Sequence, residues 1–398
     1  MARNRVTYQA QAAFVGPAII SGTESSPVHK NPDTLERIQS LDYSFNIDRA
    51  DIAQMGKLGL AARPIISQPT VNIDLNYYLG SFKNEQLFGL DFNHQSGEDG
   101  TPSQADNFEQ SLINSFTNTG DRNLDRRNFY VTVMTEDGID TREGWYEGVV
   151  DHKSDVIGIS NCFLSRYTSQ VSVGGIIENT VSLQGTDITH FKNINLGTET
   201  IPMPIIHYKQ VTGQNTKDIT IPPYRGNTAG GNTTVLSAKD VKFSVTELVT
   251  SGNMGLSLKD LKIQSYSLEL ELQRQTLRGI GYKIPIDSPI TEPAQATISV
   301  DAIVSDSQAG SLANLRAHND KFDISIDIHR NRDCPATGIA TGVTTQLANS
   351  YMLKACHLER ATYRATIGSN KMVTLGFAVD LDQEDLSKGL FLSGQINI

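Results

Sequence analysis

Few residues in this 398-residue chain have the types and spacing that a catalytic or metal-binding site needs. The densest acidic run, 380–385, lacks the turn glycine and the closing bidentate glutamate of a calcium loop, so we interpret it as a solvated loop. The segment 151–155 places a His and a Ser between two carboxylates, but a turn explains these residues as well as a catalytic dyad does. The eight histidines are scattered, which disfavours a zinc site.

The three cysteines, Cys162, Cys334 and Cys356, are too few for a disulfide framework, as is typical of synthesis in a reducing cytoplasm. Cys162 and Cys356 begin similar stretches of sequence, and a catalytic nucleophile is seldom duplicated in this way. We interpret both as small buried hydrophobes, with a disulfide between subunits as the alternative. Phosphate-binding glycine loops and a nucleophile elbow are missing from the sequence. The sequence therefore predicts no enzyme and no cofactor.

The composition is that of a globular protein, with 38% hydrophobic and 20% charged residues, and the length suggests about two or three domains. A net charge of −10 argues against a protein that binds nucleic acid by charge alone. The sequence has no apolar run of about 18 residues, so we expect no spanning helix and no membrane partner. The apolar stretch 12–20 is short and interrupted by Pro17, and we interpret it as a first strand or arm rather than a signal peptide.

Most of the elements that must position a functional surface are strands. Alternation of apolar and polar residues predicts half-buried antiparallel strands in four segments, 41–47, 71–75, 266–272 and 322–328. Two other segments have helical periodicity, 104–116 and 311–317. The prediction is a mainly β fold with one short helix in each half.

An internal repeat organises these strands. Segment 38–40 recurs as 263–265 at an offset of 225, and the apolar positions of the strand that follows stay in register. The Cys-x-Leu-x-Arg-x-Thr motif at Cys162 recurs at Cys356 at an offset of 194. Segment 181–183 then matches 373–375 after a slip of two residues. Two matches in the same order indicate a duplication.

The duplication predicts two tandem β-barrel or β-sandwich domains, residues 1–195 and 235–398. Residues 196–234 contain several Pro and Gly residues, and we expect a linker or an arm there. The first unit is the longer one, and the polar stretch 84–127 is expected to be an inserted surface loop.

Residues 37–49, followed by 51–56, resemble the tail tube (major tail) proteins of long-tailed bacteriophages, and a degraded version of the pattern recurs over 262–281. The resemblance implies two tail-tube-like domains, each a β-barrel or sandwich with a short flanking helix. It implies rings stacked around a lumen that conducts DNA. Family members with two tandem tube domains close as homotrimers with pseudo-sixfold symmetry.

The resemblance also implies a role for the long loop after the first strand of each unit, here 49–68 and 274–293, in contacts between rings. The candidate stacking residues are Arg49, Asp51, Gln54, Lys57, Arg63, Arg274, Arg278 and Lys283. An acidic lumen would let DNA slide without binding, and the candidates on alternating strands are Asp48, Glu269, Glu271, Asp323 and Asp327. The implied partners are further copies, tape-measure, distal-tail and terminator proteins, and passing DNA. The implied location is the virion tail, after synthesis in the host bacterial cytoplasm.

Two other classes of function stay open at this point. A distal tail or tail-completion protein on the same fold would stop at one ring instead of polymerising. A carbohydrate-binding β-sandwich module would need an exposed aromatic platform, and the sequence has a single Trp, Trp145, and no evident aromatic cluster.

Overall fold

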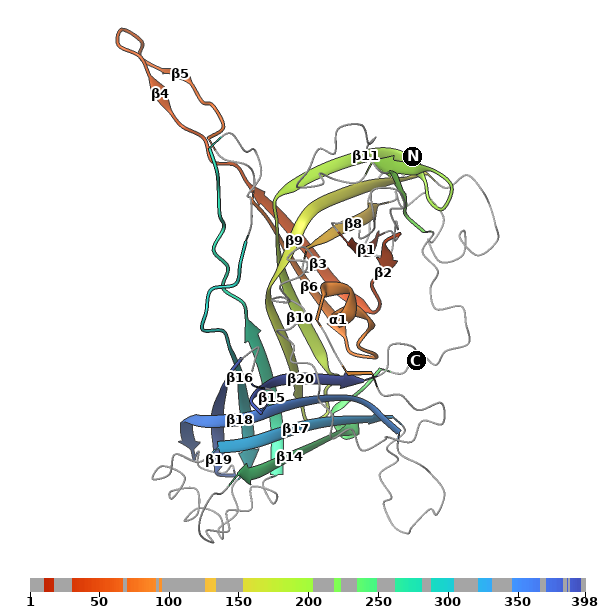
Figure 1. Cartoon of the computed structure of the whole chain (residues 1–398), viewed down its shortest axis with the longest axis vertical. Helices are drawn as coiled ribbons and strands as arrows, with labels where there is room; N and C mark the ends of the chain where they lie inside the picture. The colour runs from red at the N-terminus through yellow and green to blue at the C-terminus, as the bar shows by residue number, and fades with distance from the viewer. Residues whose placement is uncertain are drawn as a thin grey trace.

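A computed structural model gives the structure of the chain (Figure 1). The residues that it describes are 11–17, 31–66, 70–90, 93–94, 126–133, 153–202, 218–222, 235–248, 262–280, 288–303, 321–330, 346–365, 370–381, 385 and 387–394.

The fold is mainly β, as predicted, and most strands belong to one 16-stranded sheet. Its main path runs in the order β14-β17-β18-β19-β16-β15-β9-β10-β6-β3. The strands of the first half are β1 (Gln11–Pro17), β2 (Asp33–Thr34), β3 (Ile38–Asn46), β6 (Thr70–Tyr78), β8 (Arg127–Val133), β9 (Lys153–Ser172), β10 (Glu178–Gly185) and β11 (Asp187–Asn195). Those of the second half are β14 (Val241–Leu248), β15 (Lys262–Glu271), β16 (Gln295–Ile303), β17 (Lys321–Arg330), β18 (Gln346–Arg364), β19 (Met372–Asp380) and β20 (Gly389–Gly394).

The alternation in the sequence sets which face of each strand is buried. In β6, Val71, Ile73 and Leu75 are fully buried, while Asn72 and Asp74 between them are exposed. The predicted strands 71–75, 266–272 and 322–328 correspond to β6, β15 and β17, and 41–47 corresponds to β3. Half-buried antiparallel strands explain this pattern because successive side chains point to opposite faces.

The two halves repeat one pattern of strand pairing. In the first half the order is β1-β8-β9-β10-β6-β3, with β11 also on β9. In the second half it is β14-β17-β18-β19-β16-β15, with β20 also on β18. Every pair in these two series is antiparallel, which supports the predicted duplication.

Irregularities recur at the same offsets as the sequence matches. The β3–β6 register shifts between Ile38 and Ser40, and the β15–β16 register shifts between Ile263 and Ser265. Asn161 and Ala355, the residues before Cys162 and Cys356, have positive φ values of 48° and 59°. Bulges are placed by local geometry, so their recurrence at offsets of 225 and 194 aligns the two halves residue by residue.

The pairing corrects one detail of the sequence alignment. Ser182 lies opposite Arg166, and Gly376 lies opposite Arg360, the equivalent arginine. Ser182 therefore corresponds to Gly376, not to Thr374, and the slip of two residues is unnecessary. Sequence similarity favoured the slip because Val373-Thr374-Leu375 matches Val181-Ser182-Leu183 in residue type.

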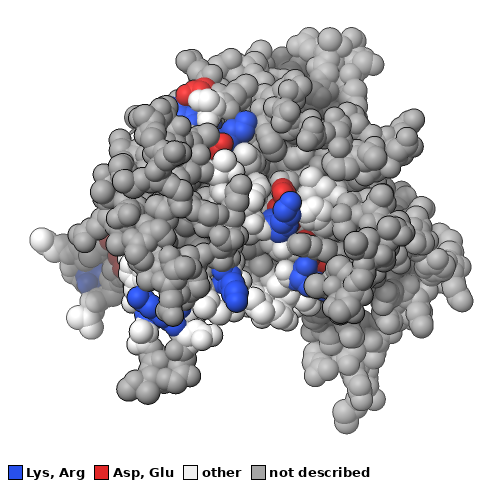
Figure 2. All heavy atoms as spheres, turned by 90° about the horizontal axis from the view of Figure 1, so that it is seen from below, with Lys and Arg blue, Asp and Glu red and all other residues white. Residues whose placement is uncertain are grey.

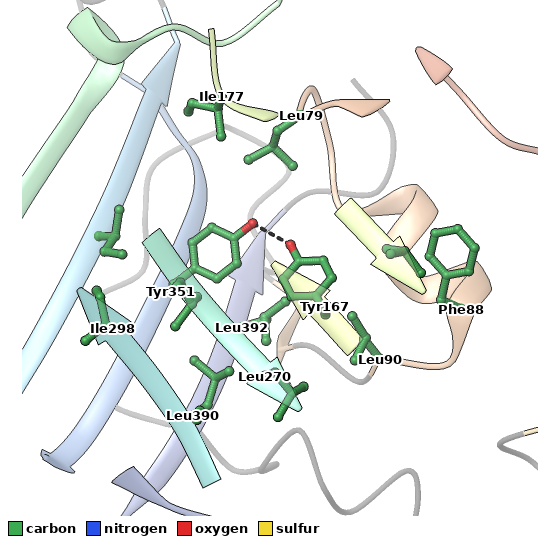
Figure 3. Close-up of a cluster of buried hydrophobic side chains, with 14 of the residues drawn as sticks. Leu79, Phe88, Leu90, Tyr167, Ile177, Leu270, Ile298, Tyr351, Leu390 and Leu392 are labelled. Atoms are coloured by element: carbon green, nitrogen blue, oxygen red, sulfur yellow. Dashed lines mark hydrogen bonds between the residues drawn. The ribbon is translucent and has the colours of Figure 1, made fainter. Parts of the chain in front are cut away.

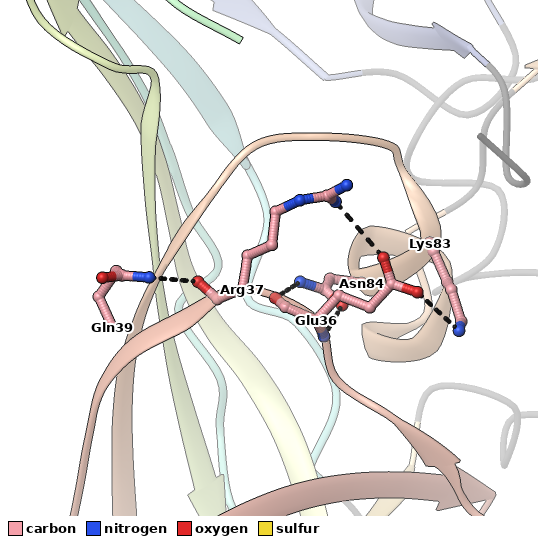
Figure 4. Close-up of polar contacts among 5 residues, drawn as sticks. All are labelled: Glu36, Arg37, Gln39, Lys83 and Asn84. Carbon is pink, nitrogen blue, oxygen red and sulfur yellow. Dashed lines mark hydrogen bonds and ion pairs between the residues drawn. The ribbon is translucent and has the colours of Figure 1, made fainter. Parts of the chain in front are cut away.

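The predicted surface loop 84–127 is wrong at its beginning. Residues Lys83–Phe88 form helix α1, which ends at Gly89 with φ 91°, a left-handed conformation that suits glycine. Asn84 pairs with the backbone of Glu36 through two hydrogen bonds of 2.9 Å, and the Lys83 ammonium lies 3.0 Å from the Glu36 carboxylate (Figure 4). These contacts fix α1 against the segment before β3. At the start of β3, Gln39 donates to the Arg37 carbonyl (Figure 4). The sequence did not reveal this helix because it is short and polar.

The remaining sequence predictions concern two helices and the linker between the halves. The helices predicted at 104–116 and 311–317 lie outside the described residues. The predicted linker 196–234 contains a hairpin of β12 (Thr200–Pro202) and β13 (Asp218–Thr220). Ile201 and Ile219 of this hairpin are buried beside Phe14 and Tyr130, so part of the linker packs on the first half.

One apolar core runs through both halves. Figure 3 shows Tyr167 of β9 facing Tyr351 of β18, with Leu270, Ile298, Leu390 and Leu392 from the second half and Leu79, Phe88, Leu90 and Ile177 from the first around them. Burial on this scale holds the halves together, since each fully buried Leu or Ile contributes roughly 1.5–3 kcal/mol.

Candidate assembly surfaces

The two halves meet through a joint in which β15 pairs with the second part of β9. Seven residue pairs form this joint, from Ser265 opposite Ser172 to Glu271 opposite Arg166. Backbone hydrogen bonds of 2.8 Å extend it at both ends, from Val173 N to the Gln264 carbonyl and from Leu272 N to the Ser165 carbonyl. The joint makes β3-β6-β10-β9 and β15-β16-β19-β18 one continuous eight-strand run.

Side chains reinforce the joint on both faces. On the polar face, Arg166 of β9 forms an ion pair with Glu269 of β15 at 2.5 Å. Arg274, just beyond β15, donates from Nε to the Leu164 carbonyl at 3.0 Å, and its guanidinium lies 5.0 Å from the centre of the Phe163 ring. An arginine from the second half thus holds the backbone of the first.

A buried polar cluster lies behind the joint. Oε1 of Glu85 accepts hydrogen bonds from Tyr77 at 2.7 Å, Asn179 at 2.8 Å and Tyr167 at 3.2 Å. The Tyr167 hydroxyl also shares a 2.7 Å hydrogen bond with the hydroxyl of Tyr351, across the two halves (Figure 3). Burial raises the pKa of the Glu85 carboxyl to about 7, against the opposing effect of the hydrogen bond from Tyr77.

Among the residues that the structure describes, nothing pairs with the two outer edges of the eight-strand run. β3 pairs with β6 on one side only, and the stretch 360–364 of β18 pairs with β19 on one side only. Tyr43 and Phe45 of β3 are 38% and 57% exposed, whereas their equivalents in β15, Leu268 and Leu270, are fully buried. The difference arises because β9 covers β15 and nothing in the described part of the chain covers β3.

One face of the eight-strand run is polar and mainly acidic. The register puts seven carboxylates on it: Asp42, Asp74, Glu178, Glu269, Glu271, Asp301 and Asp380. It puts four cations there: Arg166, Lys262, Arg360 and Arg364. Elsewhere, Figure 2 shows the lower end of the molecule, where a few basic and acidic side chains, some of them adjacent, lie among uncharged ones.

The five predicted lumen residues lie in three places in the fold: β15, β17 and the segment after β3. Glu269 and Glu271 lie on the acidic face, opposite the buried Leu268 and Leu270. Asp323 and Asp327 lie on the outward side of β17. Phe322 of β17 contacts Phe377 of β19 within the core, at 5.6 Å between ring centres, on the other side of β17 from Asp323 and Asp327. Asp48 lies just past β3, where its carbonyl accepts the Ile66 amide.

Two arms leave the same end of the run, after β3 and after β15. The first carries the short hairpin of β4 (Ile52–Ala53) and β5 (Leu60–Ala62), which projects beyond the rest of the molecule (Figure 1). The bridge Arg49–Ile65 closes the base of this arm, and the bridge Arg274–Ile290, at an offset of 225, closes the second. Their exposed apolar side chains include Met55, Leu58, Ile66, Leu277 and Ile280.

The charged residues predicted to mediate stacking have mixed positions. Arg63 and Asp51 form an ion pair at 2.7 Å within the first arm. Arg49 donates to the Arg63 carbonyl at 3.2 Å, and Arg274 makes the equivalent contact to the Ser288 carbonyl at 2.8 Å. Gln54, Lys57 and Arg278 are exposed, and Lys283 lies outside the described residues. The apolar character of the arms was not predicted, although Met55, Leu58 and Ile280 indicate it.

The two described cysteines are buried, as predicted. Cys162 and Cys356 are buried free thiols, and burial raises the pKa of Cys356 to about 12 and that of Cys162 further. Cys334 lies outside the described residues. Among the described residues, no group of three His, Cys, Asp or Glu side chains is arranged to hold a metal ion. No helix in the described part of the chain is long and apolar enough to span a membrane.

Comparisons with known proteins do not identify a family for this chain. No protein-family model matches the sequence, and no curated protein matches it. Among solved structures, the chain is similar to one in the six-fold symmetrised cryo-EM structure of the anti-feeding prophage baseplate. The identity is 11% and the TM-score 0.25, over 40% of this chain and 94% of that chain. The surfaces described above therefore carry the functional argument.

Proposed function

We propose that this chain is a structural virion protein whose copies form rings, stacked into the tail tube that conducts phage DNA. The observation that carries the proposal is the β9–β15 joint, which makes a single eight-strand sheet out of two halves and leaves both ends of that sheet open. Open, flat strand edges invite pairing with another chain. A chain that already joins two similar units edge to edge is suited to joining further copies in the same way.

Three copies per ring follow from this geometry as a proposal. Each chain supplies two units, so three chains supply the six units of a pseudo-sixfold ring. Fusing two units in one chain lowers the entropy that is lost on assembly, because every second joint forms within a chain. The two units can then differ in sequence, since their outer contacts need not be identical.

The acidic face is proposed to line the lumen. Seven carboxylates against four cations give it a net negative charge on each chain. A negative wall repels phosphates and leaves DNA mobile, whereas a basic wall would bind it in a salt-dependent way. Asp42, Asp74, Glu178, Asp301 and Asp380 extend the set first suggested by Glu269 and Glu271.

The arms are proposed to connect successive rings. Both leave the same end of the sheet, and the opposite end carries the exposed apolar side chains Val173, Ile176 and Val235. In a head-to-tail stack these ends meet, so apolar arms would be buried against apolar acceptors. This proposal replaces the pairing of basic arm residues with an acidic rim, because Arg63 and Arg274 make contacts within the chain.

Electron microscopy of the purified protein tests the proposed function. We expect tubes of stacked rings with an axial channel. Single rings that never stack would favour a distal tail or tail-completion protein instead. A protein that stays monomeric at high concentration would contradict assembly as the function, and a glycan-array signal from the monomer would favour a carbohydrate-binding module.

A further inference from the structure

We propose that β3 of one copy pairs antiparallel with residues 360–365 of a second copy, in the register that β15 and β9 use within the chain. The inference rests on the proposed function, because it names the partner of the open edges and the residues in contact. The partner is a second copy of this chain, since each chain carries both halves of the joint: one β15-like edge in β3 and one β9-like edge in β18.

The offsets that relate the two halves fix the register. The β3 equivalent of a β15 residue lies 225 positions earlier in the chain, and the β18 equivalent of a β9 residue lies 194 positions later. The pair Ser267–Gln170 of the internal joint therefore becomes Asp42–Arg364 between copies. The full set of described pairs is Leu41–Ala365, Asp42–Arg364, Tyr43–Tyr363, Ser44–Thr362, Phe45–Ala361 and Asn46–Arg360.

On the core side, this register buries side chains that are exposed in one chain. Tyr43, 38% exposed, would lie against Tyr363, 43% exposed. Phe45, 57% exposed, would lie against the small Ala361. In the internal joint the equivalent residues Leu268 and Leu270 are fully buried, so pairing would give the outer joint the same closed core. A carbohydrate platform would also expose aromatic side chains, but it would not explain their equivalence to buried leucines.

On the polar side, the register brings opposite charges together. Asp42 lies directly opposite Asp74 within the chain, a like-charge pair that destabilises a sheet. Arg364 of the second copy would lie on the other side of Asp42 and relieve this repulsion. The internal joint has an ion pair on the same face, between Arg166 and Glu269. The two joints therefore use the same chemistry with different residues.

Arg49 is placed to donate a hydrogen bond from one copy to the backbone of the next. Its equivalent, Arg274, donates from Nη1 to a carbonyl at the base of its own arm and from Nε to the Leu164 carbonyl across the joint. Arg49 makes the first of these contacts, to the Arg63 carbonyl. The equivalent of Leu164 is Leu358, so Arg49 would donate to the Leu358 carbonyl of the second copy.

Disulfide trapping tests the register. The backbone hydrogen bonds at the two ends of the internal joint make Glu269–Thr168 a non-hydrogen-bonded pair, and Ser44–Thr362 is its equivalent between copies. In such pairs the two side chains lie closest, which suits a disulfide. We expect Ser44→Cys with Thr362→Cys to give covalent chains of copies on mild oxidation of assembled protein. The parent protein and the pairs Ser44→Cys with Arg360→Cys and Ser44→Cys with Arg364→Cys are the controls for a register shifted by two residues.

Charge exchange gives an independent readout. Asp42→Arg and Arg364→Asp should each raise the protein concentration required for assembly at low salt at least tenfold. The double variant should assemble at the concentration that the parent requires. Glu178→Arg changes the same charge on the same face but on the interior strand β10, and should assemble like the parent.

The outcomes separate this pairing from the proposed function. Tubes formed by the parent, together with cross-linking at 44–362 and rescue by the charge exchange, support both. Tubes in the parent with cross-links only in the shifted controls, or with no cross-link and no rescue, overturn the pairing and leave the proposed function standing. A parent that never assembles contradicts both.

Discussion

Glu85 makes stability depend on pH in a direction opposite to that of most native carboxylates. The pKa of this buried carboxyl rises from its ordinary value of 4.5 to about 7 because burial disfavours the charged form. The folded state therefore holds the proton more tightly than the unfolded state. The stability that the neutral carboxyl contributes is fully present below pH 4.5 and is lost as the pH rises through 7.

The size of this effect follows from the pKa difference. At 1.36 kcal/mol per pKa unit, the shift corresponds to a loss of about 3 kcal/mol between pH 4 and pH 8. Glu85→Gln places a neutral amide in the same position, where it still accepts hydrogen bonds from Tyr77 and Asn179. We expect the variant to differ little from the parent at pH 4 and to be more stable by about 3 kcal/mol at pH 8.

Denaturant unfolding of unassembled protein, measured at several pH values, provides the assay. The quantity of interest is the difference in unfolding free energy between variant and parent, because other carboxylates affect both equally. Glu178→Gln, which removes a carboxylate outside the buried cluster, is the matched control. A difference for Glu85→Gln that stays flat from pH 4 to pH 8, or that falls, would refute the reasoning.

Three further predictions concern the joints and the arms. Leu270→Ala should lower the unfolding free energy by about 2–5 kcal/mol because the side chain is fully buried. The equivalent change Phe45→Ala should lower it by under about 1 kcal/mol and weaken assembly. Equal losses of stability would contradict the difference between the joints. Arg274→Ala should lower the unfolding free energy by about 1.5–3 kcal/mol through loss of the hydrogen bond to the Leu164 carbonyl. Arg49→Ala should leave the stability of the monomer unchanged and lower assembly in sedimentation assays. Unchanged assembly would show that Arg49 is not part of the joint. Replacing residues 51–63 with an Asn-Gly turn should leave folded protein and rings that no longer stack, and tubes that persist by electron microscopy would show that this arm is not the stacking element.

The sequence predicts the repeating parts of this fold better than its singular parts. Alternation in 71–75, 266–272 and 322–328 identifies real strands because one buried and one exposed face leave a period of two in the residue types. The repeated motif at Cys162 and Cys356 identifies equivalent strand positions, since local geometry and sequence recur together there. Helix α1 and the β12–β13 hairpin leave no such signal, because tertiary contacts rather than periodicity stabilise them.

The candidate assembly surfaces were also only partly predictable from the sequence. An acidic face was predictable from Glu269 and Glu271, but its extent depends on which strands are neighbours, and this is a property of the fold. Asp323 and Asp327 alternate with buried residues as Glu269 and Glu271 do, but alternation shows only that a side chain lies away from the core and not which strands are its neighbours. The open edges were not predictable, since Tyr43 and Phe45 have the pattern of buried residues.

Symmetry analysis of assembled tubes by cryo-electron microscopy tests the central claim most directly. Three chains per ring, each contributing β3-β6-β10-β9 and β15-β16-β19-β18, should close into one continuous sheet around the channel. We predict strict threefold symmetry with a pseudo-sixfold modulation, the acidic face toward the channel, and β3 paired with β18 of the next chain. Rings of six complete 43.6 kDa chains, or tubes in which Tyr43 and Phe45 remain uncovered, would contradict the account.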